Sequence, residues 1–177
     1  PPMQCNVCNT PLGEPIYESS SEHTLTSLCE LREGRSRIWG CRRCGHLRGE
    51  ALPDTPEYYE TEYRILLDHF DEDQIYDTRD DQIIYRTDHQ LDTLLSKLAL
   101  PAGTQLLDYG CAKAAMPKRL LAVRPELQIH LFDVSDMYRA YWARLVPPEH
   151  QATHQTPPDW QALFDVVTSY FALEHIP

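Results

Sequence analysis

The stretch from Leu106 to Gly110 constrains the fold more than any other part of this chain. Two leucines run into Asp108 and Gly110, and small residues then lead into a segment with helical spacing. An apolar run that stops at an acid and a glycine is typical of a buried strand that turns sharply into a helix. In doubly wound sheets a ligand crevice opens at the carboxyl ends of such strands. The turn after Asp108 is therefore a candidate cofactor site.

Two further apolar runs extend this pattern. One closes on Asp133, 25 residues after Asp108, near the spacing of roughly 20 residues at which an acid meets ribose hydroxyls in dinucleotide-binding sheets. The other begins at Phe164. Strands that alternate with helical segments favour an α/β fold with a parallel sheet. The expected elements are a helix over 80–100, a strand over 105–109, a helix over 113–123, a strand over 129–133, a helix over 136–145, a short strand over 151–154 and a strand from 164.

In this order, the three strand ends resemble those of class I S-adenosylmethionine-dependent methyltransferases. The resemblance covers residues 91–177 and implies a Rossmann-like, doubly wound parallel sheet. Because the chain starts at Pro1 and stops inside a recognisable block, we expect a piece of a longer protein whose sheet is truncated at its C-terminal side. The three blocks are Asp108-x-Gly110, Phe132-Asp133-Val134-Ser135, and Phe164-Asp165-Val166-Val167 leading to Leu173-Glu174-His175-Ile176-Pro177.

The resemblance assigns cofactor binding to the turn and to the second strand end. Asp108 would organise the turn around the amino group of the methionine moiety, and Gly110 would let the backbone come close. Asp133 would accept both ribose hydroxyls, with capping of the following helix as the alternative role. Phe132 or Val134 would flank the adenine.

The turn departs from the family pattern in one respect. The family usually has Gly-x-Gly-x-Gly after the acid, whereas Gly110 is followed here by Ala112 and Ala114. Alanine keeps the turn small but disfavours part of the geometry that glycine allows, above all positive φ angles. Ala112 is still expected among the cofactor-binding positions.

The N-terminal residues 1–50 contain two Cys-x-x-Cys pairs separated by 32 residues, which leaves room for hairpin strands. Four thiolates suit a tetrahedral zinc ion, and with every position occupied by cysteine the metal would be structural. Asn9 and Gly45 follow the pairs, and both types tolerate the left-handed backbone of a tight metal knuckle. Disulfides or free thiols are the alternative, which we disfavour in a chain without a secretion signal. The predicted ligands are Cys5, Cys8, Cys41 and Cys44.

An acidic, tyrosine-rich connector over 51–82 links this zinc-ribbon-like module to residues 83–177, which the resemblance makes the N-terminal part of a methyltransferase domain. This combination is similar to the nucleotide-sugar C-methyltransferases of deoxysugar biosynthesis, in which connector tyrosines reach the active site. The similarity makes Tyr58 and Tyr59 candidate catalytic residues, although packing explains them as well. His175 is a candidate general base, because methylating carbon requires removal of a proton. Its motif also occurs in methyltransferases that need no base.

The net charge and the hydropathy of the chain limit the classes of partner that we expect it to bind. The formal net charge is −11, and most of the excess lies in residues 51–100, which carry 13 acids against four bases. A nucleic-acid-binding surface normally has a basic stripe, so we expect a small-molecule substrate and no nucleic acid. No apolar run approaches the roughly 18 to 20 residues of a membrane span, and nothing resembles a signal peptide. We therefore expect no membrane association and a cytoplasmic location.

Three functions are compatible with these sequence features. The first is methyl transfer from S-adenosylmethionine to a small molecule, such as a nucleotide-linked sugar, with structural zinc. The second is an RNA methyltransferase with a zinc-knuckle reader, which the negative charge disfavours. The third is a non-catalytic binding or regulatory protein with a degenerate methyltransferase fold. The oligomeric state, the acceptor and the atom methylated are not encoded in any recognisable pattern.

Overall fold

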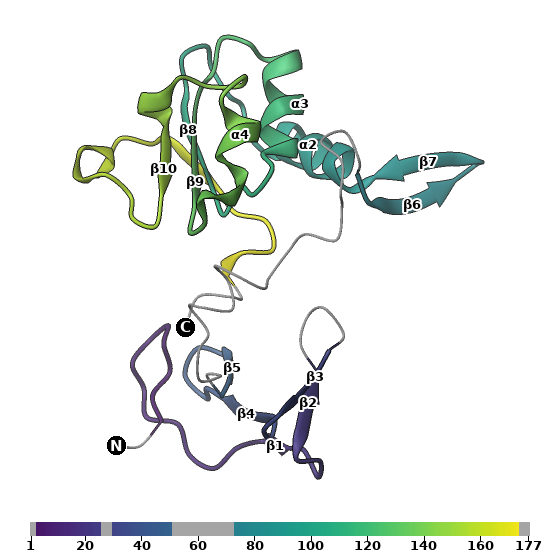
Figure 1. Cartoon of the computed structure of the whole chain (residues 1–177), viewed down its shortest axis with the longest axis vertical. Helices are drawn as coiled ribbons and strands as arrows, with labels where there is room; N and C mark the ends of the chain where they lie inside the picture. The colour runs from purple at the N-terminus through teal and green to yellow at the C-terminus, as the bar shows by residue number, and fades with distance from the viewer. Residues whose placement is uncertain (1–2, 26–29, 51–72, 174–177) are drawn as a thin grey trace. The chain divides into compact units, whose positions relative to one another are not determined.

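The computed structural model describes residues 3–25, 30–50 and 73–173 (Figure 1). These residues fall into two compact units, one N-terminal and one C-terminal, which we describe separately. The larger part of the expected connector, 51–72, lies outside the described residues.

The N-terminal unit is built from short antiparallel strands. β1, β4 and β5 form one three-stranded sheet, and β2 pairs with β3. The buried core is small: Cys5, Cys41, Leu12 and Trp39 make up nearly all of it. So few apolar side chains are a weak basis for a stable fold on their own. The strands are β1 (Tyr17–Glu18), β2 (His23–Leu25), β3 (Leu31–Glu33), β4 (Arg37–Gly40) and β5 (Leu47–Gly49).

The C-terminal unit begins with a hairpin where the sequence predicts the start of a helix. β6 (Ile75–Arg79) pairs with β7 (Gln82–Tyr85), and the hairpin projects from the end of α2 (Arg86–Lys97) in Figure 1. The expectation of a helix from residue 80 is thus wrong. Asp80 and Asp81 have φ angles of 48° and 64°, which suit a two-residue hairpin turn and cannot continue a helix.

The main sheet has four parallel strands, as the sequence predicts for an α/β fold. Its order is β10-β9-β8-β11, so the chain moves outward from β8 to β10 and then returns to the other side of β8. A crevice at the carboxyl ends of the strands is expected where the order reverses in this way. The strands are β8 (Gln105–Tyr109), β9 (Gln128–Asp133), β10 (Gln151–Thr153) and β11 (Val166–Thr168).

Two of the connecting helices are shorter than expected. α3 (Ala115–Val123) starts two residues late, because Ala114 has a left-handed backbone with φ 55°. In place of a helix over 136–145, the chain forms a 3-10 turn followed by the single-turn α4 (Arg139–Trp142). The aromatic side chains of that segment are nevertheless directed into the core.

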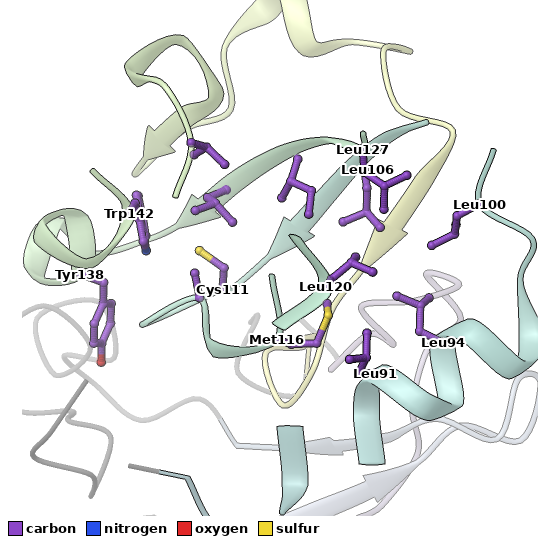
Figure 2. Close-up of a cluster of buried hydrophobic side chains, with 14 residues drawn as sticks. Leu91, Leu94, Leu100, Leu106, Cys111, Met116, Leu120, Leu127, Tyr138 and Trp142 are labelled. Atoms are coloured by element: carbon purple, nitrogen blue, oxygen red, sulfur yellow. The ribbon is translucent and has the colours of Figure 1, made fainter. Parts of the chain in front are cut away.

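Alternating residues of the strands face opposite sides of the sheet. Leu106 and Ile129 lie on the side that is covered by α2, α3 and α4, and Figure 2 shows their cluster with Leu120 and Trp142. The other side carries Leu107, Phe132, Ala152 and Trp160. This period of two is the pattern that a sheet buried on both faces requires.

Ionic contacts connect the helices on the covered face. The guanidinium of Arg119 on α3 contacts the carboxylates of Asp88 on α2 and Asp73, which precedes β6. Asp73 Oδ2 also accepts a hydrogen bond from the amide of Thr87 over 3.2 Å. These contacts hold the first turn of α2 against α3.

Leu120 provides a test of the covered face. It is fully buried, so Leu120→Ala should lower the free energy of unfolding by about 2–5 kcal/mol through lost contacts and a residual cavity. Val123 lies on the same helix and is 54% exposed, so Val123→Ala should change the free energy of unfolding by less than about 0.5 kcal/mol. Urea unfolding of both variants measures the difference. Equal effects would contradict this packing of α3.

Candidate functional site

The four predicted ligand cysteines meet in the N-terminal unit. All four Sγ atoms lie within 4.8 Å of one another. Cys5 and Cys44 are 3.7 Å apart, and Cys8 and Cys41 are 3.5 Å apart, measured between Sγ atoms. Four Zn–S bonds of 2.3 Å in a tetrahedron place sulfur atoms about 3.8 Å apart. The cluster therefore has the donor set and spacing for a structural metal ion such as zinc.

The backbone of the two Cys-x-x-Cys knuckles has the predicted conformation. Asn9 has φ 56° and Gly45 has φ 77°, both left-handed. Their amides donate to the carbonyls of Cys5 and Cys41, each over 2.9 Å. Matching turns thus present both cysteine pairs. All four cysteines are free thiols, and their sulfur separations are far beyond the 2.05 Å of a disulfide.

In the C-terminal unit, the turn after β8 has a left-handed backbone at three alternating positions. Gly110 has φ 76°, Ala112 has φ 46° and Ala114 has φ 55°. Both alanines therefore adopt the geometry that alanine disfavours, at a cost of about 1–2 kcal/mol each. The indole Nε1 of Trp142 donates to the carbonyl of Ala112 over 2.7 Å and holds the turn in place.

Close packing also requires glycine at position 110. A Cβ added to Gly110 would lie 2.3 Å from the Cβ of Ala172, which is closer than any real contact of this kind. The amides of Gly110 and Cys111 donate to the carbonyl of Phe132 over 2.8 and 3.0 Å. The turn is thus fastened to the end of β9 and contacts the segment after β11.

Asp108 is buried at the end of β8, with 4% of its surface exposed. The hydroxyl of Thr168 on β11 donates to its Oδ1 over 2.6 Å. Burial raises the pKa of Asp108 to about 7; the Thr168 hydrogen bond opposes this rise, and the charge of Asp133 adds to it. Asp108 is thus a carboxyl group that changes its charge near neutral pH.

Asp133 joins the end of β9 to the turn. Its Oδ2 accepts from the amide of Ala112 over 2.9 Å, and its Oδ1 accepts from the amide of Ser135 over 3.1 Å. Burial raises the pKa of Asp133, while these amides act in the opposite direction. The helical turn that follows is capped by Ser135, whose hydroxyl accepts from the amide of Met137, so Asp133 does not itself fill the capping role that the sequence left open. Val134, the next residue, is 48% exposed beside this carboxylate.

The third strand end contributes residues that sequence reasoning did not single out. Thr168 lies opposite Asp108 in the register of β11 and β8, a pairing that no local pattern encodes. Tyr170 is half-buried, and burial together with the charge of Asp108 raises its pKa. The hydroxyl of Ser169 is buried and has no hydrogen-bond partner within the described residues.

The structure therefore brings together the predicted cofactor positions Asp108, Gly110 and Ala112 with Asp133 at one edge of the sheet. Of the candidate catalytic residues, Tyr58, Tyr59 and His175 lie outside the described residues.

Comparison of the chain with protein-family models and with curated proteins finds no match. Among the helices that the structure describes, none is long and apolar enough to cross a membrane. Geometry and chemistry of the two sites are therefore the basis for a functional proposal.

The metal site has a direct test. We expect the purified chain to hold about one zinc ion, and Cys41→Ala to lose it, because three thiolates leave the tetrahedron incomplete. Cys111→Ala is the matched control, since Cys111 belongs to the core of the C-terminal unit. Elemental analysis after dialysis measures the metal content. Equal metal content in the Cys41 variant and the wild type would contradict the assignment.

Asp108 has a pH-dependent test. Its pKa is higher in the folded chain than the ordinary 3.8, so the folded state retains a proton that the unfolded state loses between pH 4 and 7. Asp108 therefore destabilises the fold increasingly as pH rises, by on the order of 4 kcal/mol above pH 7. Relative to wild type, Asp108→Asn should become steadily more stable from pH 4 to 8 in urea unfolding.

The control for this experiment is Asp92→Asn, which removes the same charge from an exposed position on α2. The free energy of unfolding of Asp92→Asn should differ from that of wild type by a nearly constant amount over the same pH range. If the difference in free energy of unfolding between Asp108→Asn and wild type is also constant over this pH range, the pKa of Asp108 is not raised in the folded chain.

Proposed function

We propose that this chain is part of an S-adenosylmethionine-dependent methyltransferase with a Rossmann-like sheet, and that it acts on a small-molecule acceptor. The observation that carries the proposal is the left-handed turn at Gly110, Ala112 and Ala114. It lies where the strand order reverses, beside the acid that ends β9. A small-residue turn of this shape lets a ligand approach the backbone closely.

The residues at this edge suit the chemistry of the cofactor. Asp133 accepts one backbone amide on each oxygen, and each oxygen retains a further lone pair for a ribose hydroxyl. The exposed apolar side chain of Val134 suits the face of an adenine ring. Ionised Asp108 contributes negative potential to a site for a positively charged ligand.

When bound, S-adenosylmethionine supplies an electrophilic methyl group on a sulfonium, so the protein's contribution is chiefly to position cofactor and acceptor. Tyr58, Tyr59 and His175 stay predictions for the acceptor side. A nucleotide-linked sugar is the acceptor class that the resemblance favours, and the net charge of −11 disfavours a nucleic acid. We place this activity in the cytoplasm.

The N-terminal unit would serve this function as a zinc-stabilised scaffold. With four thiolates in the cluster, a bound zinc ion has no open coordination position, which excludes a catalytic role for it. The binding energy of the metal would compensate for the small apolar core.

One observation favours the alternative of a non-catalytic binding protein. Ala172 packs directly on Gly110, so the chain itself occupies the space beside the glycine. This contact closes one side of the turn to a ligand. Cofactor titration distinguishes the two functions.

The decisive experiment is calorimetric titration of the zinc-loaded chain with S-adenosylhomocysteine. We expect a dissociation constant in the micromolar range, and a loss of at least about tenfold in Asp133→Asn, because one acceptor for the ribose is removed. Asp92→Asn is the control with the same change in charge. Urea unfolding of each variant shows whether the fold is intact. No binding by the folded, zinc-loaded wild type would favour the non-catalytic alternative.

A further inference from the structure

The N-terminal unit contains a cavity beside its small apolar core. The volume of this cavity is about 540 Å³, within the range of roughly 300–1,000 Å³ that is typical of small-molecule sites. Leu12 and Trp39 line it, and both side chains belong to the buried core. Met3 lines it as well and packs against the same core. A ligand that enters the cavity therefore meets an apolar surface that is already formed.

The charged side chains that line the cavity are Glu14, Glu18 and Arg37, which leaves an excess of one carboxylate. The Nε of Arg37 lies 3.0 Å from Oε1 of Glu18, and its Nη1 lies 3.5 Å from Oε1 of Glu50. The hydrogen bond from Arg37 lowers the pKa of Glu18, so Glu18 is ionised at neutral pH. The guanidinium of Arg37 thus already has two carboxylate partners.

Glu14 supplies the excess negative charge. Its side chain is exposed, and it forms no ion pair or hydrogen bond with any other residue that the structure describes. A cation in the cavity can approach this carboxylate directly, whereas an anion must displace Glu18 or Glu50 from Arg37. Matching charges at a binding surface favour one class of partner and reject the other. The cavity therefore suits a positively charged ligand.

We propose that this cavity binds an organic cation that carries an ammonium group on an apolar body. In this assignment the apolar body lies against Leu12 and Trp39, and the ammonium group lies beside Glu14. Burial of the apolar body supplies most of the affinity, and the exposed ion pair supplies the preference for positive charge. The N-terminal unit then has a binding role in addition to that of a zinc-stabilised scaffold.

The test uses three probes that share a phenylbutyl body and differ in the charge of the head group: phenylbutylamine, phenylbutanol and phenylbutanoate. The zinc-loaded chain is titrated with each probe, and the indole N–H signals of its three tryptophans are followed by NMR. Trp39 lies in the N-terminal unit, whereas Trp142 and Trp160 lie in the C-terminal unit and report binding elsewhere. The amine should shift the Trp39 signal and bind about two- to fivefold more tightly than the alcohol, with the carboxylate weakest.

Glu14→Lys should reverse this order, because the unpaired charge beside the cavity changes its sign. We expect the amine to bind about three- to tenfold more weakly than to wild type, and the carboxylate to become the tighter ligand. Glu33→Lys is the matched control, since it makes the same change at an exposed position on β3, outside the lining of the cavity. It should keep the wild-type order.

Two results would overturn the assignment. One is a Trp39 signal that none of the probes shifts in the folded, zinc-loaded chain. The other is the wild-type order of affinities in Glu14→Lys. Neither result bears on the proposed methyl transfer, which rests on the C-terminal unit and is tested with a different ligand.

Discussion

The hydrogen bond from the amide of Ala112 to Asp133, 2.9 Å long, is the contact on which the C-terminal site depends. It joins the turn after β8 to the end of the neighbouring strand, and the amides of Gly110 and Cys111 reinforce the same junction through the carbonyl of Phe132. Because several backbone groups are satisfied together, the turn can retain two alanines in left-handed conformations that would be costly in isolation. The edge of the sheet is thereby shaped before any ligand binds.

The two units differ in what stabilises their buried centres. In the C-terminal unit, Asp108 is buried within the sheet, and its removal from water favours the protonated carboxyl group. The N-terminal unit has too few apolar residues for an equally large hydrophobic core, and its buried centre consists largely of cysteine sulfur and Trp39. Metal coordination therefore suits the N-terminal unit, whereas hydrophobic packing is sufficient for the other.

Local patterns predicted a large part of the fold. The four strands of the main sheet were expected close to their observed positions, because buried parallel strands appear as short apolar runs. The boundaries of the helices were less accurate. The helical spacing from Ile83 onward could not reveal that Asp80 and Asp81 form a hairpin turn, since the same apolar residues also satisfy a strand. The length of α4 was overestimated for a related reason. Aromatic residues at helical spacing can also reach the core from irregular turns, so their spacing alone does not require a long helix.

The sequence by itself determined the cysteine cluster and the chemical character of the strand ends, because ligand spacing and apolar runs are local properties. Only the tertiary structure decided that Thr168 donates to Asp108 and that Ala172 closes on Gly110. It also decided that Arg86 contacts the ring of Phe171 instead of an acid. These pairs join residues from 60 to more than 80 positions apart, and their proximity follows from the strand order. A contact of this kind has no local sequence signal, because it exists only once the parallel strands have paired.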